Sequence, residues 1–285
     1  MIKMIQLYQL IVKRVMSNME NMNDFIKQPV IYHGSKRGLD GPIKIGYVSA
    51  DNQILSRSKT DFGLGFYMGT NYKQCLGIVN NEAKPYMYEI TIPKDLITNE
   101  NTLVLEKEDW TYFVLYNRGY LEDIKGTDFY NYYAHLADNK QYIIGAIADD
   151  TFNACIDDFS KNNITDYTFM QLIDCFNLGV QVVAKSQEAC DKLQILSENA
   201  ITKDERKKSL ESTRLNHNER NDYYDEKRNE YNIERKGKYL FEIFKEAREN
   251  SIIYNKDNID TNKFKNIKFP DTIHDKGDDE IELYN

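Results

Sequence analysis

The sequence has few of the residues that build covalent or metal-bound frameworks. It contains four cysteines in 285 residues, and they lie far apart at positions 75, 155, 175 and 190. No two of them form a C-x-x-C pair, so we expect neither a disulfide framework nor a metal site, and reduced thiols predict a cytoplasmic protein. Five prolines and 14 glycines without a regular spacing exclude a collagen-like chain.

Long apolar runs are also missing. No stretch approaches the run of about 18 apolar residues that a transmembrane helix needs, so we expect no membrane span. Residues 1–28 carry apolar side chains at helical spacing, interrupted by Gln6 and Gln9. This pattern predicts an N-terminal amphipathic helix packed on the following domain rather than a signal peptide. A helix that binds a membrane surface or a partner is the alternative.

The chain lacks an excess of positive charge, and its polarity is unevenly distributed. The formal net charge of -8 argues against non-specific affinity for nucleic acid backbones. Half of the residues from 201 to 250 are Asp, Glu, Lys or Arg. We therefore expect a globular domain at 29–197 and a charged tail at 198–285, partly helical and partly disordered, that the fold does not require. Within this tail, residues 239–244 have the pattern of a docking helix.

The globular segment alternates short strands with short helices in an irregular order. Apolar or alternating runs predict strands at 29–32, 86–92, 103–105, 142–145 and 179–184. Helical patterns occur at 71–79, at 110–116, twice between 151 and 177, and at 187–196. Such an order predicts an α+β fold with short helices and helical extensions at both ends, rather than a doubly wound sheet.

Two short motifs in this segment are candidates for a binding site. Tyr32-His33-Gly34-Ser35 ends a strand, and a glycine there lets a ligand approach the backbone closely. The alternative is a histidine that is satisfied by neighbouring backbone groups. Residues 61–67 read D-F-G-L-G-F-Y before a helix, and such a G-x-G turn can cradle a phosphate. The third glycine of a dinucleotide fingerprint is missing, so a Rossmann fold is not expected.

The two motifs together resemble those of the ADP-ribosyltransferase superfamily. Y-H-G-S followed about 30 residues later by G-x-G-F-Y and a helix is similar to the diphtheria-toxin and poly(ADP-ribose) polymerase class, whose motifs read H, Y and E. On DFGLGFYMGTNYKQC, EDWTYFVLYNR and IIGAIADD, the chain also resembles a family of uncharacterised bacterial domains within that superfamily. The resemblance covers about residues 29–196. It implies a split β-sheet core and NAD as a substrate, without a metal.

The resemblance also implies roles for individual residues. His33 would hold the adenosine-side ribose of NAD, and the Gly34 backbone would pair with the nicotinamide carboxamide. Tyr67 would pack against nicotinamide, and together with His33 and Gln181 it belongs to the expected catalytic set. The same comparison adds neighbouring residues to the NAD-binding set, namely Ser35, Gly65 and Phe66.

The third motif departs from the family pattern, because Gln181 occupies the position of the usual glutamate. Cleavage of the nicotinamide–ribose bond passes through an oxocarbenium-like state that a fixed carboxylate stabilises. Glutamine brings no charge, which in a dry site forfeits about 2–4 kcal/mol. Asp61, Asp149 and Asp150 are the candidates for a substitute carboxylate, the last two also suiting a turn or a helix cap. Gln181→Glu is expected to accelerate nicotinamide release.

These inferences predict an NAD-dependent mono-ADP-ribosyltransferase that transfers ADP-ribose to a macromolecule. The acidic balance favours a protein acceptor, and a nucleic acid acceptor stays open. A role as a toxin or defence effector, and an antitoxin as a partner, are implied by the resemblance alone. Two alternatives remain: a catalytically weak module that binds NAD or ADP-ribose, and an NAD glycohydrolase that uses water as the acceptor.

Overall fold

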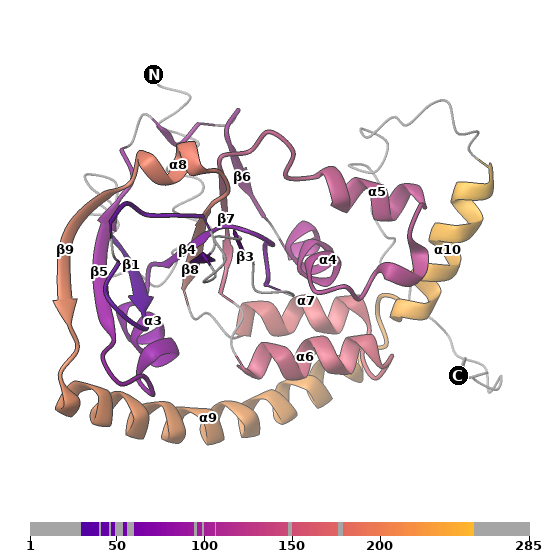
Figure 1. Cartoon of the computed structure of the whole chain (residues 1–285). Helices are drawn as coiled ribbons and strands as arrows, with labels where there is room; N and C mark the ends of the chain where they lie inside the picture. Colours follow the sequence, from indigo (N-terminus) through magenta and orange to yellow (C-terminus); the bar gives the residue numbers. More distant parts are fainter. Residues whose placement is uncertain are drawn as a thin grey trace, which may run out of the picture.

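The structure is a computed structural model that describes residues 30–39, 41–45, 47–48, 54–55, 60–93, 96–98, 100–105, 107–147, 150–175 and 179–253. The helix predicted at 1–28 and the acidic C-terminal end lie outside these residues. The described chain combines an open seven-stranded sheet with helices (Figure 1). The predicted α+β class is therefore confirmed.

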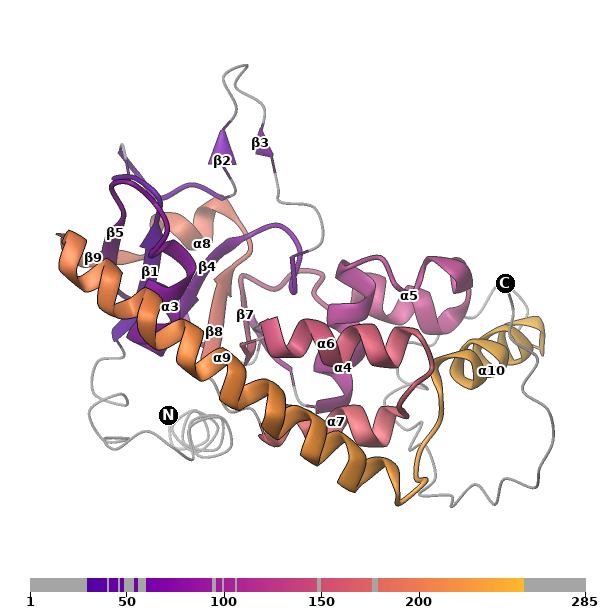
Figure 2. The same ribbon diagram turned by 90° about the horizontal axis from the view of Figure 1, so that it is seen from below.

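The large sheet is almost wholly antiparallel. Its strands in spatial order are β6 (Thr102–Val104), β7 (Tyr142–Ala146), β8 (Val180–Ala184), β4 (Phe66–Gly69), β1 (Val30–Ser35), β5 (Tyr86–Thr91) and β9 (Gln194–Ala200). Among the described strands, β6 and β7 form the one parallel pair. A second, two-stranded sheet pairs β2 (Tyr47–Val48) with β3 (Ile54–Leu55), and this hairpin projects from the body (Figure 2).

The joint between β1 and β4 is the weakest in the large sheet. β1 pairs with β5 over all six of its residues, from Val30 to Ser35. Between β1 and β4, by contrast, the described residues form one register pair, Tyr32 with Gly69. The sheet therefore consists of two halves, β6-β7-β8-β4 and β1-β5-β9, which a single pair connects.

Strand alternation gives the sheet two faces with separate cores. Phe66 and Met68 of β4 share one buried cluster with alternate residues of β8 and with Tyr88 and Ile90 of β5. The helix α8 (Gln187–Asp191) contributes Ala189 and Cys190 to this cluster. We call this side of the sheet face A. On the opposite side, face B, Val183 of β8 packs into a larger, aromatic-rich cluster.

Helices cover face B. A helical layer lies over the β7-β8 half and comprises α4 (Lys107–Asn117), η2 (Glu122–Ile124), α5 (Asp128–His135), α6 (Asp150–Ser160) and α7 (Asp166–Cys175). The helix α3 (Tyr72–Val79) covers β1, and its N-cap Asn71 accepts a hydrogen bond from the Gln74 backbone, as the sequence predicts for 71–79.

The helix predicted at 187–196 is wrong in its second half. α8 ends at Asp191, and the chain then forms β9, which pairs along the edge of β5. Nearly every residue of β9 is exposed, so its sequence has no apolar alternation to indicate a strand. Its pairing with β5, more than 100 residues earlier, is a tertiary interaction that a local pattern does not reveal.

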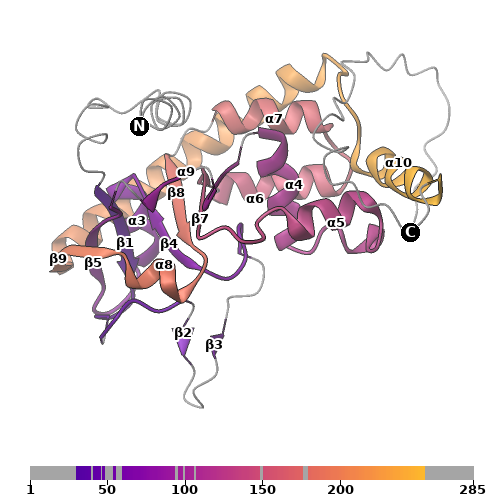
Figure 3. The ribbon, with the colours of Figure 1, turned by 90° about the horizontal axis from the view of Figure 1, so that it is seen from above.

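The charged segment after residue 197 is folded onto the domain, and the predicted boundary falls inside β9. α9 (Lys203–Asn232) runs past α3, α6 and α7 (Figures 2 and 3). At one end Arg206 donates to the Glu82 carbonyl at 2.5 Å, and at the other the Tyr224 hydroxyl donates to Asp158 at 2.6 Å. The helix therefore spans from the β1-β5-β9 half to the helical layer.

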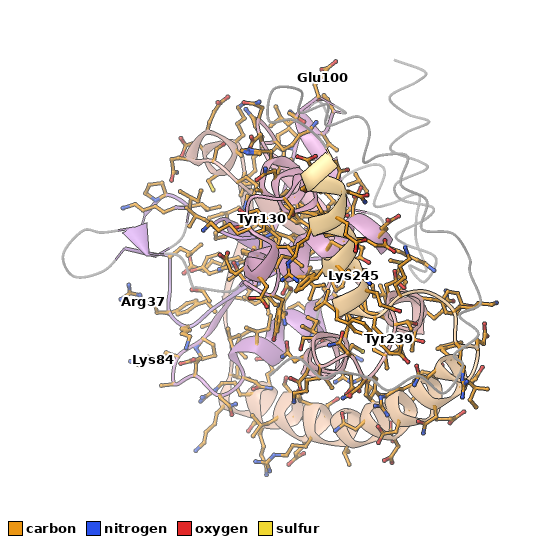
Figure 4. All side chains as sticks on the ribbon, turned by 90° about the vertical axis from the view of Figure 1, so that its right-hand side faces the viewer. Arg37, Lys84, Glu100, Tyr130, Tyr239 and Lys245 are labelled. Carbon is orange, nitrogen blue, oxygen red and sulfur yellow. The ribbon has the colours of Figure 1, made fainter. Side chains whose placement is uncertain are left out.

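The last described helix, α10 (Leu240–Ile253), docks on the helical layer, as the pattern at 239–244 predicts. Leu240, Ile243 and Phe244 are buried in the aromatic-rich cluster. In Figure 4, Tyr130 of α5 lies beside α10, and the two helices are in contact. The expectation that the fold does not require the tail is corrected, because these buried side chains belong to the core. Among the described residues, none of the helices has the length and apolarity to cross a membrane.

Candidate functional site

His33 lies where the two halves of the sheet separate. Its Nδ1 is 2.7 Å from the carbonyl oxygen of Tyr67, and its ring stacks on Phe66 with 4.2 Å between the centroids. A carbonyl only accepts, so Nδ1 carries the proton. Burial lowers the pKa of His33, against a smaller opposing effect of the Tyr67 carbonyl. The ring is therefore neutral at pH 7, and its Nε2 is a hydrogen-bond acceptor.

The structure does not gather the three expected catalytic side chains on one face. His33 stacks on Phe66, which places it on face A. Tyr67 packs against the aromatic-rich cluster of face B, and Gln181 is its diagonal neighbour on the same face. The link between His33 and Tyr67 runs through the Tyr67 backbone. Tyr67 and Gln181 are thus together, whereas His33 reaches them only across the joint between β1 and β4.

The glycines of the two motifs are needed for close packing. A Cβ on Gly34 would lie 2.6 Å from the Cys75 carbonyl oxygen of α3, and one on Gly65 would lie 2.3 Å from Cγ1 of Val183. Both glycines therefore admit a neighbouring element of the protein itself. Ser35 ends β1 opposite Tyr86 and is half-buried. The structure assigns these residues a packing role, and their expected contacts with NAD stay predictions.

The Tyr67 hydroxyl holds the segment 60–65, which we call the G-x-G loop. It donates to the Gly63 carbonyl at 2.7 Å and accepts from the Phe62 backbone at 3.0 Å. The Thr60 hydroxyl donates to the same Gly63 carbonyl at 2.8 Å. Burial raises the pKa of Tyr67 far above its usual range, so the hydroxyl stays protonated. The ring's polar end is thus engaged by the loop that precedes it.

Asp61 is the carboxylate that the fold brings to Gln181. The amide nitrogen Nε2 of Gln181 donates to Oδ2 of Asp61 at 3.1 Å and to the Ala146 carbonyl at 2.9 Å. Gln181 is 7% exposed. Among the described side chains, Asp61 is therefore the candidate carboxylate that contacts the third-motif residue. Asp149 lies outside the described residues, and Asp150 begins α6 without a described side chain.

Arg118 fixes the Asp61 carboxylate from the opposite side. Its Nε and Nη2 donate to Oδ1 of Asp61 at 2.9 and 2.5 Å, and its Nη1 donates to Oδ1 of Asn153 at 2.6 Å. Both side chains of the ion pair are largely buried, at 15% and 12% exposure. A charged pair of this kind is well oriented, and Oδ2 stays directed at Gln181. The site thus joins the G-x-G loop, α4, α6 and β8.

Sequence reasoning undervalued Arg118 and missed Lys185. From the sequence, Arg118 either contacts a phosphate or ribose or closes the end of a helix, and the second role is favoured; its observed partner Asp61 is 57 residues away. Lys185 follows β8 on the same face as Gln181, and its amine donates to the Phe62 carbonyl of the G-x-G loop. Burial lowers the pKa of Lys185 to about 8. A lysine and an arginine would be expected near a loop that can cradle a phosphate, but no local sequence pattern pairs these two residues with the loop.

The geometry therefore offers a carboxylate, a carboxamide and an aromatic ring on face B, with a neutral imidazole at the joint. Among the described residues, no group of three or more His, Cys, Asp or Glu side chains is arranged to hold a metal ion.

A family model described as a protein of unknown function (DUF3990) matches residues 30–195, more than half of the chain. No curated protein sequence and no solved structure matches the chain.

Proposed function

The chain belongs to the DUF3990 family of proteins of unknown function, and from that premise and the site we propose that it is an NAD-dependent mono-ADP-ribosyltransferase. The observation that carries the proposal is the hydrogen bond from Gln181 to Asp61. It supplies a carboxylate beside the residue that replaces the glutamate of the third motif. The G-x-G loop thereby restores the charge that the late strand lacks.

The reaction assigns each group of the site a task. The bond between C1′ of the ribose and the nicotinamide nitrogen breaks, and its electron pair leaves with nicotinamide. Asp61 stabilises the positive charge that develops on the ribose, and Gln181 orients a ribose hydroxyl. An acceptor nucleophile then forms a bond to C1′ and loses its proton. The net charge of -8 favours a protein as this acceptor over a nucleic acid.

The joint between β1 and β4 supports the same proposal. NAD is long enough for its two ends to meet different parts of the sheet, and one register pair holds the halves together there. Nε2 of His33 accepts a hydrogen bond from a ribose hydroxyl on face A, while nicotinamide lies towards Tyr67 on face B. We propose that NAD binds at this joint, with its adenosine-side ribose towards His33 and its nicotinamide towards Tyr67.

A second candidate, a module that binds NAD without cleaving it, is favoured by one observation. Arg118 pairs with Asp61, and such a pair has little net charge with which to stabilise a cation. If the pair persists in the complex, the site binds ribose hydroxyls but does not accelerate cleavage. The two candidates differ in whether Asp61 acts as a charge or as a hydrogen-bond acceptor.

Nicotinamide release from NAD by the purified protein tests both candidates. We expect release by the wild-type protein and transfer of labelled ADP-ribose to a protein in cell extract. Asp61→Asn should slow release about 100-fold or more while calorimetry still detects NAD binding. Asp157→Asn is the matched control, because Asp157 is exposed and pairs with Lys161, and it should match the wild type.

The other outcomes separate the alternatives. If NAD binds but stays intact for hours, the protein is a binding module and not an enzyme. Free ADP-ribose without any modified macromolecule would identify a glycohydrolase. Equal release rates for Asp61→Asn and the wild type would remove Asp61 from the mechanism.

A further inference from the structure

The G-x-G loop contacts face B of β8 and of the residue that follows the strand at three points. Gln181 donates to Asp61 near the start of the loop, and Lys185 donates to the Phe62 carbonyl. Between these contacts, Gly65 packs against Val183 so closely that a Cβ would meet Cγ1 at 2.3 Å. The loop is therefore held by three consecutive face-B residues of one strand and its extension.

Lys185 is unusual among these contacts because it brings a charge. The half-buried amine forms no ion pair among the described residues, and the Phe62 carbonyl is its hydrogen-bond partner there. Burying an ammonium group without a counter-charge is unfavourable, whereas an apolar side chain of similar length would pack at no such cost. What the amine adds at this position is the bond to the loop.

We propose that Lys185 is a positioning residue that fastens the G-x-G loop over β8 and so holds the Asp61 carboxylate beside Gln181. The Phe62 carbonyl immediately precedes Gly63, whose φ of 71° lies in the left-handed region where the loop turns. Holding this carbonyl fixes the plane of the turn, and with it the direction of the preceding Asp61. The consequence for catalysis rests on the proposed function, but the fastening of the loop does not.

Fastening by a buried amine makes loop closure depend on pH. Burial lowers the pKa of Lys185 to about 8 in the closed loop, whereas a solvent-exposed lysine has a pKa near 10.4. The closed loop thus binds its proton less tightly than the open loop, and raising the pH favours closure. For these two values, the open fraction falls about tenfold between pH 7 and pH 9.

The surrounding groups do not produce this dependence. Asp61, within the loop, forms an ion pair with Arg118, and burial raises the pKa of Tyr67 far above its usual range. The other close neighbours are the uncharged Asn117 side chain at Gly63 and the backbone of Gln141, whose carbonyl accepts from the Lys185 backbone. Among the described groups that contact the loop, Lys185 is thus the one whose pKa burial lowers.

Pulse-labelled amide hydrogen exchange of the peptide covering 60–66, corrected for intrinsic rates, tests the proposal on the full chain. The Phe62 and Gly63 amides are hydrogen-bonded in the closed loop, so their exchange reports opening. In the wild type, corrected exchange should slow about tenfold from pH 7 to pH 9. Lys185→Met should abolish this dependence, because no group at position 185 then takes up a proton when the loop opens.

Two further variants keep the test decisive. Lys185→Arg keeps a donor but does not titrate, so its corrected exchange should be flat even if the methionine variant folds poorly. Lys192→Met removes a half-buried lysine that pairs with Glu188 away from the loop, and it should keep the full tenfold change. Flat exchange in the wild type, or a tenfold change that persists in both Lys185 variants, would overturn the proposal.

The outcome for function is separable. If the exchange results hold but no variant or wild-type protein releases nicotinamide, the fastening stands and the enzyme proposal fails. If nicotinamide is released while wild-type exchange is flat, the enzyme proposal stands and Lys185 loses its role. If both hold, Lys185→Met should remove the change in the pH profile of nicotinamide release near pH 8.

Discussion

Gln181→Glu is the substitution on which the sequence and the structure disagree. From the sequence, a glutamate at this position restores the third motif and accelerates nicotinamide release. In the structure, however, the Gln181 amide nitrogen donates to Asp61 at 3.1 Å and to the Ala146 carbonyl at 2.9 Å. A carboxylate there would face another carboxylate and a carbonyl oxygen. We therefore expect the substitution to destabilise the protein at neutral pH.

The magnitude follows from the environment of the side chain. Position 181 is 7% exposed, and Arg118 is already engaged by Asp61. Burial and the nearby carboxylate together raise a glutamate pKa by about 3 units in such sites, which corresponds to about 4 kcal/mol. The Ala146 carbonyl still accepts a hydrogen bond from the Trp110 indole at 2.9 Å. Losing the Gln181 donor therefore adds little to the free-energy cost of the substitution. Ionisation of the new carboxyl thus dominates the cost.

The pH dependence of unfolding identifies this cause. A carboxyl group with a raised folded-state pKa destabilises the protein increasingly as the pH rises above its unfolded value of about 4.3. Relative to the wild type, the loss from ionisation should be about 1 kcal/mol at pH 5 and about 4 kcal/mol at pH 8. Urea denaturation at both pH values measures it. Gln181→Met removes the same donor without adding a charge, so its loss should be equal at the two pH values.

Two results would refute this reasoning. A Gln181→Glu protein that loses less than about 1 kcal/mol at pH 8 would show that the carboxylate is accommodated without repulsion. A loss that is the same at pH 5 and pH 8 would show that ionisation is not the cause. In either case the Gln181–Asp61 contact would not be the feature that defines this site.

Two other predictions concern the loop and the C-terminal helix. Tyr67→Phe would be mild if only the packing of the ring mattered, but it should lower the free energy of unfolding in urea by about 2–4 kcal/mol, because the Phe62 amide and the Gly63 carbonyl both lose the hydroxyl. Tyr120→Phe, at an exposed ring, should change that free energy by no more than about 0.5 kcal/mol. Equal losses for the two variants would contradict the bridging role of the Tyr67 hydroxyl. Ending the chain at Lys238 removes four buried side chains of α10 (Leu240, Ile243, Phe244 and Ala247), so the Tm should fall by about 10 °C or more. A fall of less than about 3 °C would place α10 outside the cooperative core.

The strands of the domain were predictable because their patterns are local. Apolar and alternating runs locate β1, β5, β7 and β8 close to their observed bounds. β9 could not be predicted in this way, because it is an exposed edge strand whose stability comes from pairing with β5. Apolar patterns in a sequence arise where side chains are buried, and most side chains of β9 are exposed.

The start of the charged helix α9 is marked in the sequence by a capping motif, although the charged composition of the segment suggests a partly disordered tail. Thr202 and Glu205 form a capping box, in which the Thr202 side chain accepts from the Glu205 backbone and Glu205 accepts from the Thr202 backbone. The spacing T-x-x-E is legible in the sequence. The contacts that stabilise α9, such as Tyr224 with Asp158, join residues 66 apart and are not legible.

The candidate site was predictable in part. The motif positions of Tyr67 and Gln181 lead to two residues that the fold places on one face, and Asp61 was among three carboxylates considered. The choice among these three depends on distances across 120 residues of sequence, which no pattern encodes. The separation of His33 from Tyr67 by the plane of the sheet likewise follows from strand register, and not from motif order.

The strand order has a consequence for how this protein is made. β4 stands between β1 and β8, and its ladder with β8 joins Phe66 to Ala184. During synthesis, the centre of the sheet therefore stays incomplete until more than 100 further residues have left the ribosome. β1 and β5 can pair early, because both lie within the first 91 residues, but β5 waits for β9 to cover its outer edge. The nascent chain thus exposes two open strand edges for most of its elongation, and chaperone demand should be greatest just before β8 emerges.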